Sequence, residues 1–252
     1  MRILITSGGT KIPIDSVRHI ANMSSGTFGS KIALEALKNG HATAFFYAEN
    51  SKTPFTYTSN LFKTKNSEEY IKELVRLEEL KFNLRKYANL QSSAYDEKTY
   101  SDFDTYFSGL KLYIDEIKPD VIVLAAAVSD YGVDNYVDGK IRSKDSDMVI
   151  KLKALPKVIS QVKSWAPKAY LVGFKLLVDS TNEELIENAK KSIETNGCDM
   201  VVANDLRDIK NNEHRLIIVK PNKEPYMYYT NHHLEANSLA QAVVREIEKD
   251  LK

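Results

Sequence analysis

The sequence predicts an α/β protein with a largely parallel sheet and an antiparallel ribbon near its C-terminus. Three observations lead to this fold class. Residues 2–48 follow the order strand, long loop, helix, strand, which is a βαβ unit. The run Val121–Ala126 is continuously apolar, as in strands buried on both faces of a parallel sheet. The apolar runs 216–219 and 226–229 flank the polar turn Pro221–Glu224, which indicates a hairpin.

The first half of the chain holds the opening unit and a helical stretch. A short strand, Arg2–Ser7, stops at a glycine pair, and the helix over 24–39 ends before an aromatic strand at 41–48. Apolar residues at spacings of three and four predict further helices over 67–90 and 101–118, separated by a polar, turn-like segment at 91–98. We therefore expect a helical insertion over about 67–118.

The second half alternates helices and strands. Its predicted elements are a flap over about 132–147, a strand at 148–153, a helix over 156–165 that begins at a proline, strands at 170–174 and 199–203, a helix over 180–195 and a closing helix over 234–251. Ser180 and Glu183 have the spacing of a capping box. Because neither a repeat nor a low-complexity linker interrupts the chain, we expect residues 1–252 to form a single domain.

Composition excludes several classes of protein. The 252 residues are 43% hydrophobic and 27% charged, which is ordinary for a globular chain. Lys and Arg number 35 and Asp and Glu 34, and the net charge of +1 argues against nucleic-acid and membrane partners. The one cysteine, Cys198, has no partner for a disulfide, and no signal-peptide pattern opens the sequence. We therefore expect a cytoplasmic protein.

The loop after the first strand has the composition of a phosphate site. Thr6–Thr10 contains two adjacent glycines, whose backbone N–H groups can approach an anion closely. Asn22–Gly29 leads into a helix, where free N–H groups and the positive end of the helix dipole favour phosphate. Tight turns and helix caps explain either glycine cluster when it stands alone, but two clusters in one loop favour phosphate binding. Neither is a dinucleotide fingerprint or a P-loop.

Further candidates follow other strands, because ligands of open parallel sheets bind at the carboxyl ends of strands. Small residues at Ala125–Ala127 leave space beside the backbone, and Asp130 either accepts a hydrogen bond from a ligand or caps a turn. Phe174 either stacks on a base or fills the core, and Asn204 either bonds a base or forms an Asx turn.

Two cationic features are open to two interpretations. Arg18, inside the first loop, either grips a carboxylate or phosphate or forms a surface salt bridge. Lys140, Arg142 and Lys144 either clamp a polyphosphate or form a solvated face. The histidines are scattered, and no group of residues has metal-ligand spacing, so we expect no metal site made by the protein itself.

In this order, these segments resemble the phosphopantothenoylcysteine synthetase family, the phosphopantothenate–cysteine ligases of coenzyme A biosynthesis. The longest match runs through residues 6–15 and 17–22 to Ser24–Gly26 and Gly29. The other matching residues are Ala126–Tyr131, Lys140–Ile141, Pro156–Lys157, Val172–Lys175 and Ala203–Asp205. The resemblance covers essentially the whole chain. Because nothing precedes Met1 and the helical stretch is long, it looks like the stand-alone form rather than the form fused to a flavin-dependent decarboxylase.

The resemblance implies a Rossmann-like, three-layer subunit that forms a homodimer. It implies a ligase that joins 4′-phosphopantothenate to the amine of cysteine with a nucleoside triphosphate and Mg²⁺. The substrate carboxylate would attack the α-phosphorus and release pyrophosphate, and the cysteine amine would then displace the nucleotide from the acyl-nucleotide. Fused bacterial forms prefer CTP and eukaryotic forms use ATP; of the two, we expect CTP. We also expect the tyrosine-rich helical region to offer surface to the homodimer.

The resemblance assigns roles to individual residues. The triphosphate would be lined by Gly8, Ser24, Gly26 and Gly29, the nucleoside held by Phe174 and Asn204, and phosphopantothenate contacted by Asn22, Ala126, Ala127 and Asp130, with Arg18 reaching it from the other subunit. Asn22 and Lys140 would be the catalytic residues, Lys140 by stabilising charge during acyl transfer. The alternatives are a Rossmann-type NAD(P)-dependent oxidoreductase, for which the glycine spacing is wrong, and a flavin-binding or regulatory nucleotide-binding module.

Overall fold

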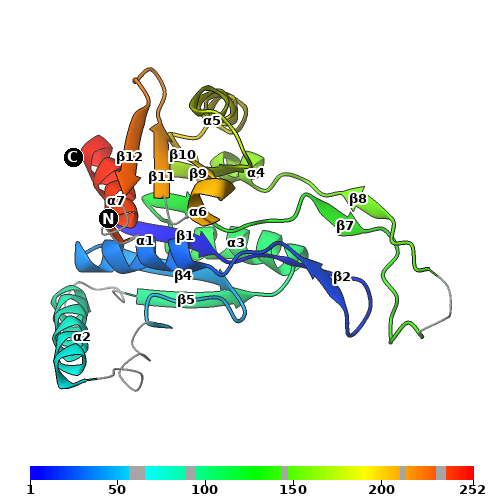
Figure 1. Ribbon diagram of the computed structural model, residues 1–252, viewed down its shortest axis with the longest axis horizontal. Helices are drawn as coiled ribbons and strands as arrows, with labels where there is room; N and C mark the ends of the chain where they lie inside the picture. The colour runs from blue at the N-terminus through cyan, green and yellow to red at the C-terminus, as the bar shows by residue number, and fades with distance from the viewer. Residues whose placement is uncertain (57–65, 89–94, 143–146, 211–213, 231–236) are drawn as a thin grey trace.

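The computed structural model describes residues 1–56, 66–88, 95–142, 147–210, 214–230 and 237–252. One sheet contains β1 (Arg2–Ser7), β4 (Ala42–Ala48), β5 (Tyr95–Tyr100), β6 (Val121–Leu124), β9 (Tyr170–Leu177), β10 (Met200–Asp205), β11 (His214–Val219) and β12 (Tyr226–Thr230). The order across it is β12-β11-β10-β9-β6-β1-β4-β5 (Figure 1). From β10 across to β5 in this order, all neighbouring strands pair in parallel, whereas β11 and β12 form the expected antiparallel ribbon. The predicted fold class is confirmed.

Helices cover both faces of the sheet and complete three layers. The helices are α1 (Thr27–Lys38), α2 (Ser67–Ala88), α3 (Phe103–Ile117), α4 (Ile159–Trp165), α5 (Asn182–Asn196), α6 (Leu206–Lys210) and α7 (Asn237–Leu251). Successive side chains of a strand face opposite sides, so Ile3 and Ile5 pack with α1 and α7, and Leu4 packs with α3, α4 and α5. None of the described helices is long and apolar enough to cross a membrane.

An edge strand replaces part of the predicted turn and helical insertion. Residues 95–98 belong to β5, which pairs in parallel with β4, so the turn-like prediction is wrong there; residues 89–94 lie outside the described part. The interior of β5 is polar and exposed, because backbone pairing rather than side-chain burial holds this edge. Tyr100, Tyr106 and Tyr113 are buried around Phe46. These three tyrosines fill the core and offer no surface, whereas the contribution of the rest of the region to a homodimer stays a prediction.

The predicted helix starts are shifted in α4 and α5. The capping box of α5 lies one residue later than expected: Glu184 N donates to Thr181 Oγ1 at 3.2 Å, and Thr181 N donates to Glu184 Oε2 at 2.8 Å. Ser180 N instead donates to the buried carboxylate of Asp205 at 2.7 Å. Helix α4 begins at Ile159, after an extended Pro156 segment. Residues 234–236, predicted as the start of the closing helix, lie outside the described part.

Two small antiparallel pairs project from the sheet as an arm, of which the sequence predicted one strand, at 148–153, that the structure places later, at Leu152–Ala154. Strands β2 (Lys11–Pro13) and β3 (His19–Ala21) fold within the first loop, and β7 (Tyr131–Val133) pairs with β8 (Leu152–Ala154). Figure 1 shows β2, β7 and β8 extending together beyond the carboxyl ends of the parallel strands. The arm therefore begins where ligands of such sheets bind.

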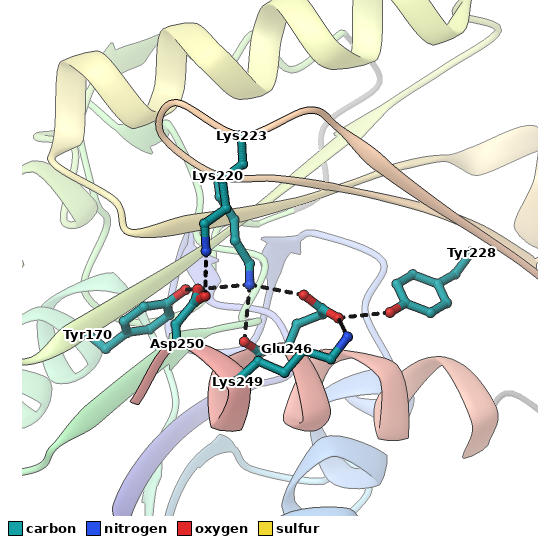
Figure 2. Close-up of polar contacts among 7 residues, drawn as sticks. All are labelled: Tyr170, Lys220, Lys223, Tyr228, Glu246, Lys249 and Asp250. Atoms are coloured by element: carbon teal, nitrogen blue, oxygen red, sulfur yellow. Dashed lines mark hydrogen bonds and ion pairs between the residues drawn. The ribbon is translucent and has the colours of Figure 1, made fainter. Parts of the chain in front are cut away.

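A buried ion-pair cluster joins the ribbon and α7 to the start of β9, at the end of the sheet opposite the arm (Figure 2). Lys220, only 8% exposed, contacts Asp250 Oδ2 at 2.7 Å and Glu246 Oε2 at 3.0 Å. The hydroxyl of Tyr170, at the start of β9, donates to Asp250 at 2.6 Å, and that of Tyr228 donates to Glu246 at 3.0 Å. Burial acts to raise the pKa of Asp250, but hydrogen bonds from Lys220 and other donors outweigh it and lower the pKa to about 2.

We expect Asp250→Asn to lower stability at neutral pH and to have little effect in acid. The folded pKa of about 2 lies below the ordinary 3.8, so the carboxylate contributes stability above about pH 4 that is lost as the pH falls through about 2. The variant should be less stable by on the order of 1–2 kcal/mol at about pH 7. Urea unfolding followed by circular dichroism measures this. Asp115→Asn, an exposed acid paired with Lys118 at 3.2 Å, is the control; a pH-independent difference for Asp250→Asn would contradict the assignment.

Candidate active site

The loops that leave β1 and β6 stay hydrogen-bonded beyond the ends of both strands. Ala126 N donates to Thr6 Oγ1 at 3.2 Å, and Ala127 N donates to Gly8 O at 2.7 Å. Further out, Thr10 N donates back to Ala127 O at 3.2 Å. These contacts bring the predicted glycine loop and the predicted alanine segment to one edge of the sheet.

The predicted triphosphate glycines lie where the backbone requires glycine. Gly8, with φ +88°, and Gly26, with φ +73°, adopt left-handed conformations, and Gly26 directly precedes α1. A Cβ on Gly29 would lie 2.5 Å from Ser7 Oγ, so this glycine lets α1 pack closely on β1. Ser24 lies in the same loop, two residues before Gly26, and its N–H donates to Asn22 O at 2.9 Å. The free N–H groups at the start of α1 consequently face the carboxyl edge, an arrangement suited to phosphate.

Asn22 joins the glycine loop to the alanine segment. Its Nδ2 donates to Ala127 O at 3.2 Å. Its own carbonyl lies against Gly9, where a Cβ would come within 2.7 Å of it. The structure therefore brings together Asn22 and Ala127, which the sequence assigned to the same substrate.

A cavity of about 490 Å³ opens beside the alanine segment, on the face of the sheet covered by α4 and α5. Ala126, Asp130 and Phe174, all predicted site residues, line it. Asp130 is paired with Lys157, from the segment before α4. The volume falls within the range of ordinary ligand pockets.

The two residues predicted to hold a nucleoside lie on neighbouring strands, and β9 continues past Phe174, where the predicted strand ended, to Leu177. Phe174 lies in β9, and its ring meets the ring of Phe28 in α1 edge-on, with centroids 5.8 Å apart. Asn204 lies in β10, half-buried, next to the strand that holds Phe174. The Phe174 ring packs with the α1 face of the sheet, which is the side on which the glycine loop enters its helix.

Arg18 lies in the arm, apart from this edge, and is held by Asp15 of its own chain. Arg18 Nε and Nη2 donate to Asp15 Oδ2 at 3.0 and 2.6 Å, and Nη2 also donates to Ile141 O at 2.7 Å. Asp15 additionally accepts hydrogen bonds from the backbone N–H groups of Val17, Arg18 and Ile141. The Arg18 guanidinium, helped by these N–H groups, holds the pKa of the Asp15 carboxyl well below its usual range. The reach of Arg18 into a second subunit stays a prediction.

Lys140 is exposed on the predicted flap, directly before the residue that Asp15 holds. The first half of this flap is anchored: Ser16 N donates to Gly139 O at 3.0 Å, and Gly139 N donates to Ser16 Oγ at 2.8 Å. Residues 143–146, including Lys144, lie outside the described part. The structure thus fixes the backbone beside Lys140 and leaves its side chain in solvent.

No group of three or more His, Cys, Asp and Glu side chains gathers as a metal site within the described residues. What the carboxyl edge offers instead is N–H groups, hydroxyls and ammonium groups, the chemistry of anion binding. Any Mg²⁺ at this edge would therefore take most of its ligands from phosphate and water.

Comparison with known proteins identifies the family. Residues 1–77 and 112–251 match the family described as DNA/pantothenate metabolism flavoprotein C-terminal domain. The chain belongs to this family. It is 33% identical over 218 residues to the coenzyme A biosynthesis bifunctional protein CoaBC of Thermococcus kodakarensis, covering 86% of this chain and 44% of that protein. The human phosphopantothenate–cysteine ligase is 31% identical over 225 residues, which are 81% of this chain and 72% of the human protein. The family resemblance in the sequence is confirmed.

A solved structure of the DNA/pantothenate metabolism flavoprotein family has the same fold. The Streptococcus pneumoniae flavoprotein aligns with a TM-score of 0.74 at 26% identity over 99% of both chains. The family match omits residues 78–111, which contain the second half of α2, β5 and the first half of α3. The predicted insertion thus overlaps the part of this chain that the family match leaves out.

Several residues that the sequence did not assign border the predicted ones. Asp15 holds Arg18, and Lys157, Lys175 and Lys191 line the cavity. The spacing of Asp15 and Arg18 was a visible signal for an ion pair, since both can meet across one turn. Nothing in its sequence spacing distinguishes Lys191 from its neighbours on α5.

We expect Asp15→Asn to increase local opening of the arm, at the loop between β2 and β3 and at Ile141. The amide keeps the shape of the carboxylate but loses the charge that holds Arg18 and the N–H of Ile141. Amide exchange at Val17, Arg18 and Ile141 should accelerate about tenfold or more, as hydrogen–deuterium exchange can measure. Asp138→Asn, an exposed neighbour with only a 3.5 Å contact to Ser16 Oγ, is the matched control. Equal exchange in both variants would refute the anchoring role of Asp15.

Proposed function

We propose that this protein is a phosphopantothenate–cysteine ligase, which forms a C–N bond between 4′-phosphopantothenate and cysteine. One observation carries the proposal: a phosphate-type glycine loop and a small-residue segment, which borders a cavity lined by lysines, are hydrogen-bonded to each other at one edge of the sheet. A ligase of this kind must hold a nucleotide and an acid in contact. Membership of a family with phosphopantothenate–cysteine ligases among its relatives supports it.

In this proposal, the chain positions two substrates for two displacements. The N–H groups of Gly26–Gly29 hold the triphosphate, while Ala126 and Ala127 leave room for the acid. The carboxylate oxygen attacks the α-phosphorus, and pyrophosphate leaves with the electrons of the broken P–O bond. The cysteine amine then attacks the acyl carbon, and the nucleotide leaves from it. Asn22, which spans both loops, lies where charge develops, and a fixed donor of this kind commonly contributes about 10²–10³ in rate. Lys140, exposed on the arm, would bring an ammonium group to the same charge.

The nucleotide of this proposal is CTP in preference to ATP, as expected from the resemblance. Phe174, which pairs with Val202 of β10, and Asn204, two residues further along β10, are the side chains offered to the nucleoside. Mg²⁺ would accompany the triphosphate and offset its charge. The buried thiol of Cys198 and the absence of a spanning helix among the described residues agree with a cytoplasmic location.

We also propose a homodimer in which the arms of two copies meet. Large apolar side chains are exposed on the arm and the adjoining loop, among them Val17 at 61%, Tyr131 at 57% and Val149 at 91%. Surfaces of this kind are typical of protein interfaces. Because Arg18 lies on the same arm, a second copy would bring this guanidinium towards the partner's carboxyl edge.

The dimer prediction has a direct measurement. Val149→Glu places a charge on the exposed arm, so it should shift the mass in light scattering from two copies to one and reduce ligase activity together. Leu112→Glu, at an exposed position of α3 with 68% exposure, should change neither. A fully active wild-type protein of monomeric mass would show that the arm does not serve a dimer.

The experiment that tests the ligase is pyrophosphate release. The protein is incubated with cysteine, phosphopantothenate and either CTP or ATP, and competition between the nucleotides gives the preference. Release that depends on phosphopantothenate is expected. Oxidation of NAD(P)H without phosphopantothenate would favour the oxidoreductase alternative. If both activities are absent, the protein would be a module that only binds a nucleotide, as in regulation.

Lys140→Ala and Arg142→Ala should separate catalysis from nucleotide binding. Lys140 is exposed next to the anchored Ile141, so its ammonium can meet charge that develops during transfer. Its loss should lower kcat about 10²-fold with a smaller effect on nucleotide Kd. Arg142→Ala should mainly weaken nucleotide binding, because its fork suits ground-state phosphates. Steady-state kinetics and calorimetry measure both; a near-wild-type kcat for Lys140→Ala would identify the segment as a solvated loop.

A further inference from the structure

We propose that Asp15 is a positioning residue of the reaction, which fixes the flap backbone beside Lys140 and acts on catalysis through that lysine. The inference rests on the proposed function, in which the Lys140 ammonium group meets the charge that develops during transfer. The sequence motifs assign Asp15 no role of its own. Its side chain is nevertheless buried, although residues 16–17 and 19–21, which follow it in the arm, are exposed.

Both oxygens of the Asp15 carboxylate accept hydrogen bonds. Oδ1 accepts from the backbone N–H groups of Val17 at 2.9 Å and Arg18 at 2.8 Å, which closes a turn and fixes the direction of the carboxylate. Oδ2 accepts from Nε and Nη2 of Arg18 at 3.0 and 2.6 Å and from the backbone N–H of Ile141 at 3.1 Å. The first oxygen therefore serves the loop of Asp15 itself, and the second oxygen reaches the flap.

Ile141 is held at both polar groups of its backbone. Its N–H donates to Asp15 Oδ2, and its carbonyl accepts from Nη2 of Arg18 at 2.7 Å. The same Nη2 donates to Asp15, so the three residues form a closed set of hydrogen bonds. Hydrogen bonds to ionised groups are stronger than those between neutral groups. Because the carboxylate also orients the guanidinium, loss of its charge would release the carbonyl of Ile141 as well as the N–H.

The residue on the other side of Lys140 is held as well. Ser16 N donates to Gly139 O at 3.0 Å, and Gly139 N donates to Ser16 Oγ at 2.8 Å. These bonds join neutral groups of exposed residues, so they are weaker than those of the buried carboxylate. Lys140 thus lies between two fixed residues, and Asp15 supplies the stronger of the two attachments.

A fixed backbone matters for Lys140 because its side chain is long and exposed. Within the described part of the chain, its ammonium group has no hydrogen bond or ion pair. Ordering a long side chain at a reacting group costs conformational entropy, and a backbone that is fixed in advance removes part of that cost. Displacement of a reacting group by about 1 Å can lower the rate about 10²-fold. We therefore expect Asp15 to affect kcat more than nucleotide binding.

A double-mutant cycle with Lys140→Ala tests whether Asp15 acts through this lysine. Asp15→Asn keeps an oxygen for the turn but presents an NH₂ group to the donors of Arg18 and Ile141. In the wild-type background it should lower kcat about tenfold, with the nucleotide Kd from calorimetry within about twofold. In the Lys140→Ala background the same change should alter kcat by less than about twofold, because the lysine through which Asp15 acts is gone.

A second carboxylate of the arm provides the matched control. Asp134 pairs with Lys151 at 3.0 Å, and Asp134→Asn should leave kcat unchanged in both backgrounds. If Asp15→Asn does not fold, Asp15→Ser takes its place, because a hydroxyl can accept from the turn but is too short to reach Ile141. Unchanged kcat in a folded Asp15 variant would overturn the proposal. So would an equal loss in the wild-type and Lys140→Ala backgrounds, since Asp15 would then act without the lysine.

A spin label at residue 140 separates the positioning role from the proposed ligase function. Lys140→Cys accepts the label, while the native Cys198 is buried and protected from it. Electron paramagnetic resonance should show a more mobile label after Asp15→Asn and no change after Asp134→Asn. If wild-type protein releases no pyrophosphate, the ligase function fails, and the label still decides whether Asp15 fixes this backbone. Equal mobility with and without the Asp15 carboxylate would refute the positioning role.

Discussion

The continued contact between β1 and β6, beyond the ends of both strands, is the interaction on which the site depends. Within the sheet these strands pair in parallel from Ile3 to Thr6. Past it, the N–H of Ala127 still reaches the carbonyl of Gly8. Connections that leave neighbouring parallel strands generally diverge to opposite faces where a crevice opens. Here the hydrogen bonds hold the two connections together, so the glycine loop and the alanine segment share one edge of the sheet.

Buried tyrosines hold the polar end of β1 in place. The hydroxyl of Tyr100 donates to Ser7 O at 2.7 Å, and the hydroxyl of Tyr106 donates to Thr6 Oγ1 at 3.3 Å. Burial raises the pKa of both tyrosines, so they remain neutral donors at ordinary pH. Their rings belong to the core around Phe46. The core therefore supports the site by direct hydrogen bonds to the strand that begins the glycine loop.

The elements that bury apolar side chains, and the ribbon whose strands a short turn joins, were predictable, whereas an edge strand that pairs with a distant segment was not. The continuous apolar run of β6 and the spacing of apolar residues along α3 predicted a strand and a helix that the structure contains. Strand β5 escaped prediction because its exposed edge carries polar side chains. Its backbone partner β4 lies more than forty residues away in the chain, so no local pattern records the pairing.

The candidate site divides in the same way. Gly8 and Asn22 stand out because special backbone geometry and strand ends leave a local signature in the sequence. Lys191 does not, since only the packing of α5 against the sheet brings it to the cavity that Ala126 also lines. Only one partner of Asp15 was predictable from spacing. Arg18 follows three residues later, but Ile141, whose N–H donates to the same carboxylate, lies 126 residues away in the chain. Contacts of that range depend on topology, which local spacing does not encode.

The placement of Phe174 and Lys175 on opposite faces of β9 has a consequence for the kinds of sequence change that this strand tolerates. Because side chains alternate along a strand, inserting one residue before Phe174 would turn its ring towards α4 and α5 and the Lys175 side chain towards α1. A substitution at either position changes one layer of the molecule, whereas an insertion changes both layers at once. Variation in length is therefore confined to the connections between strands.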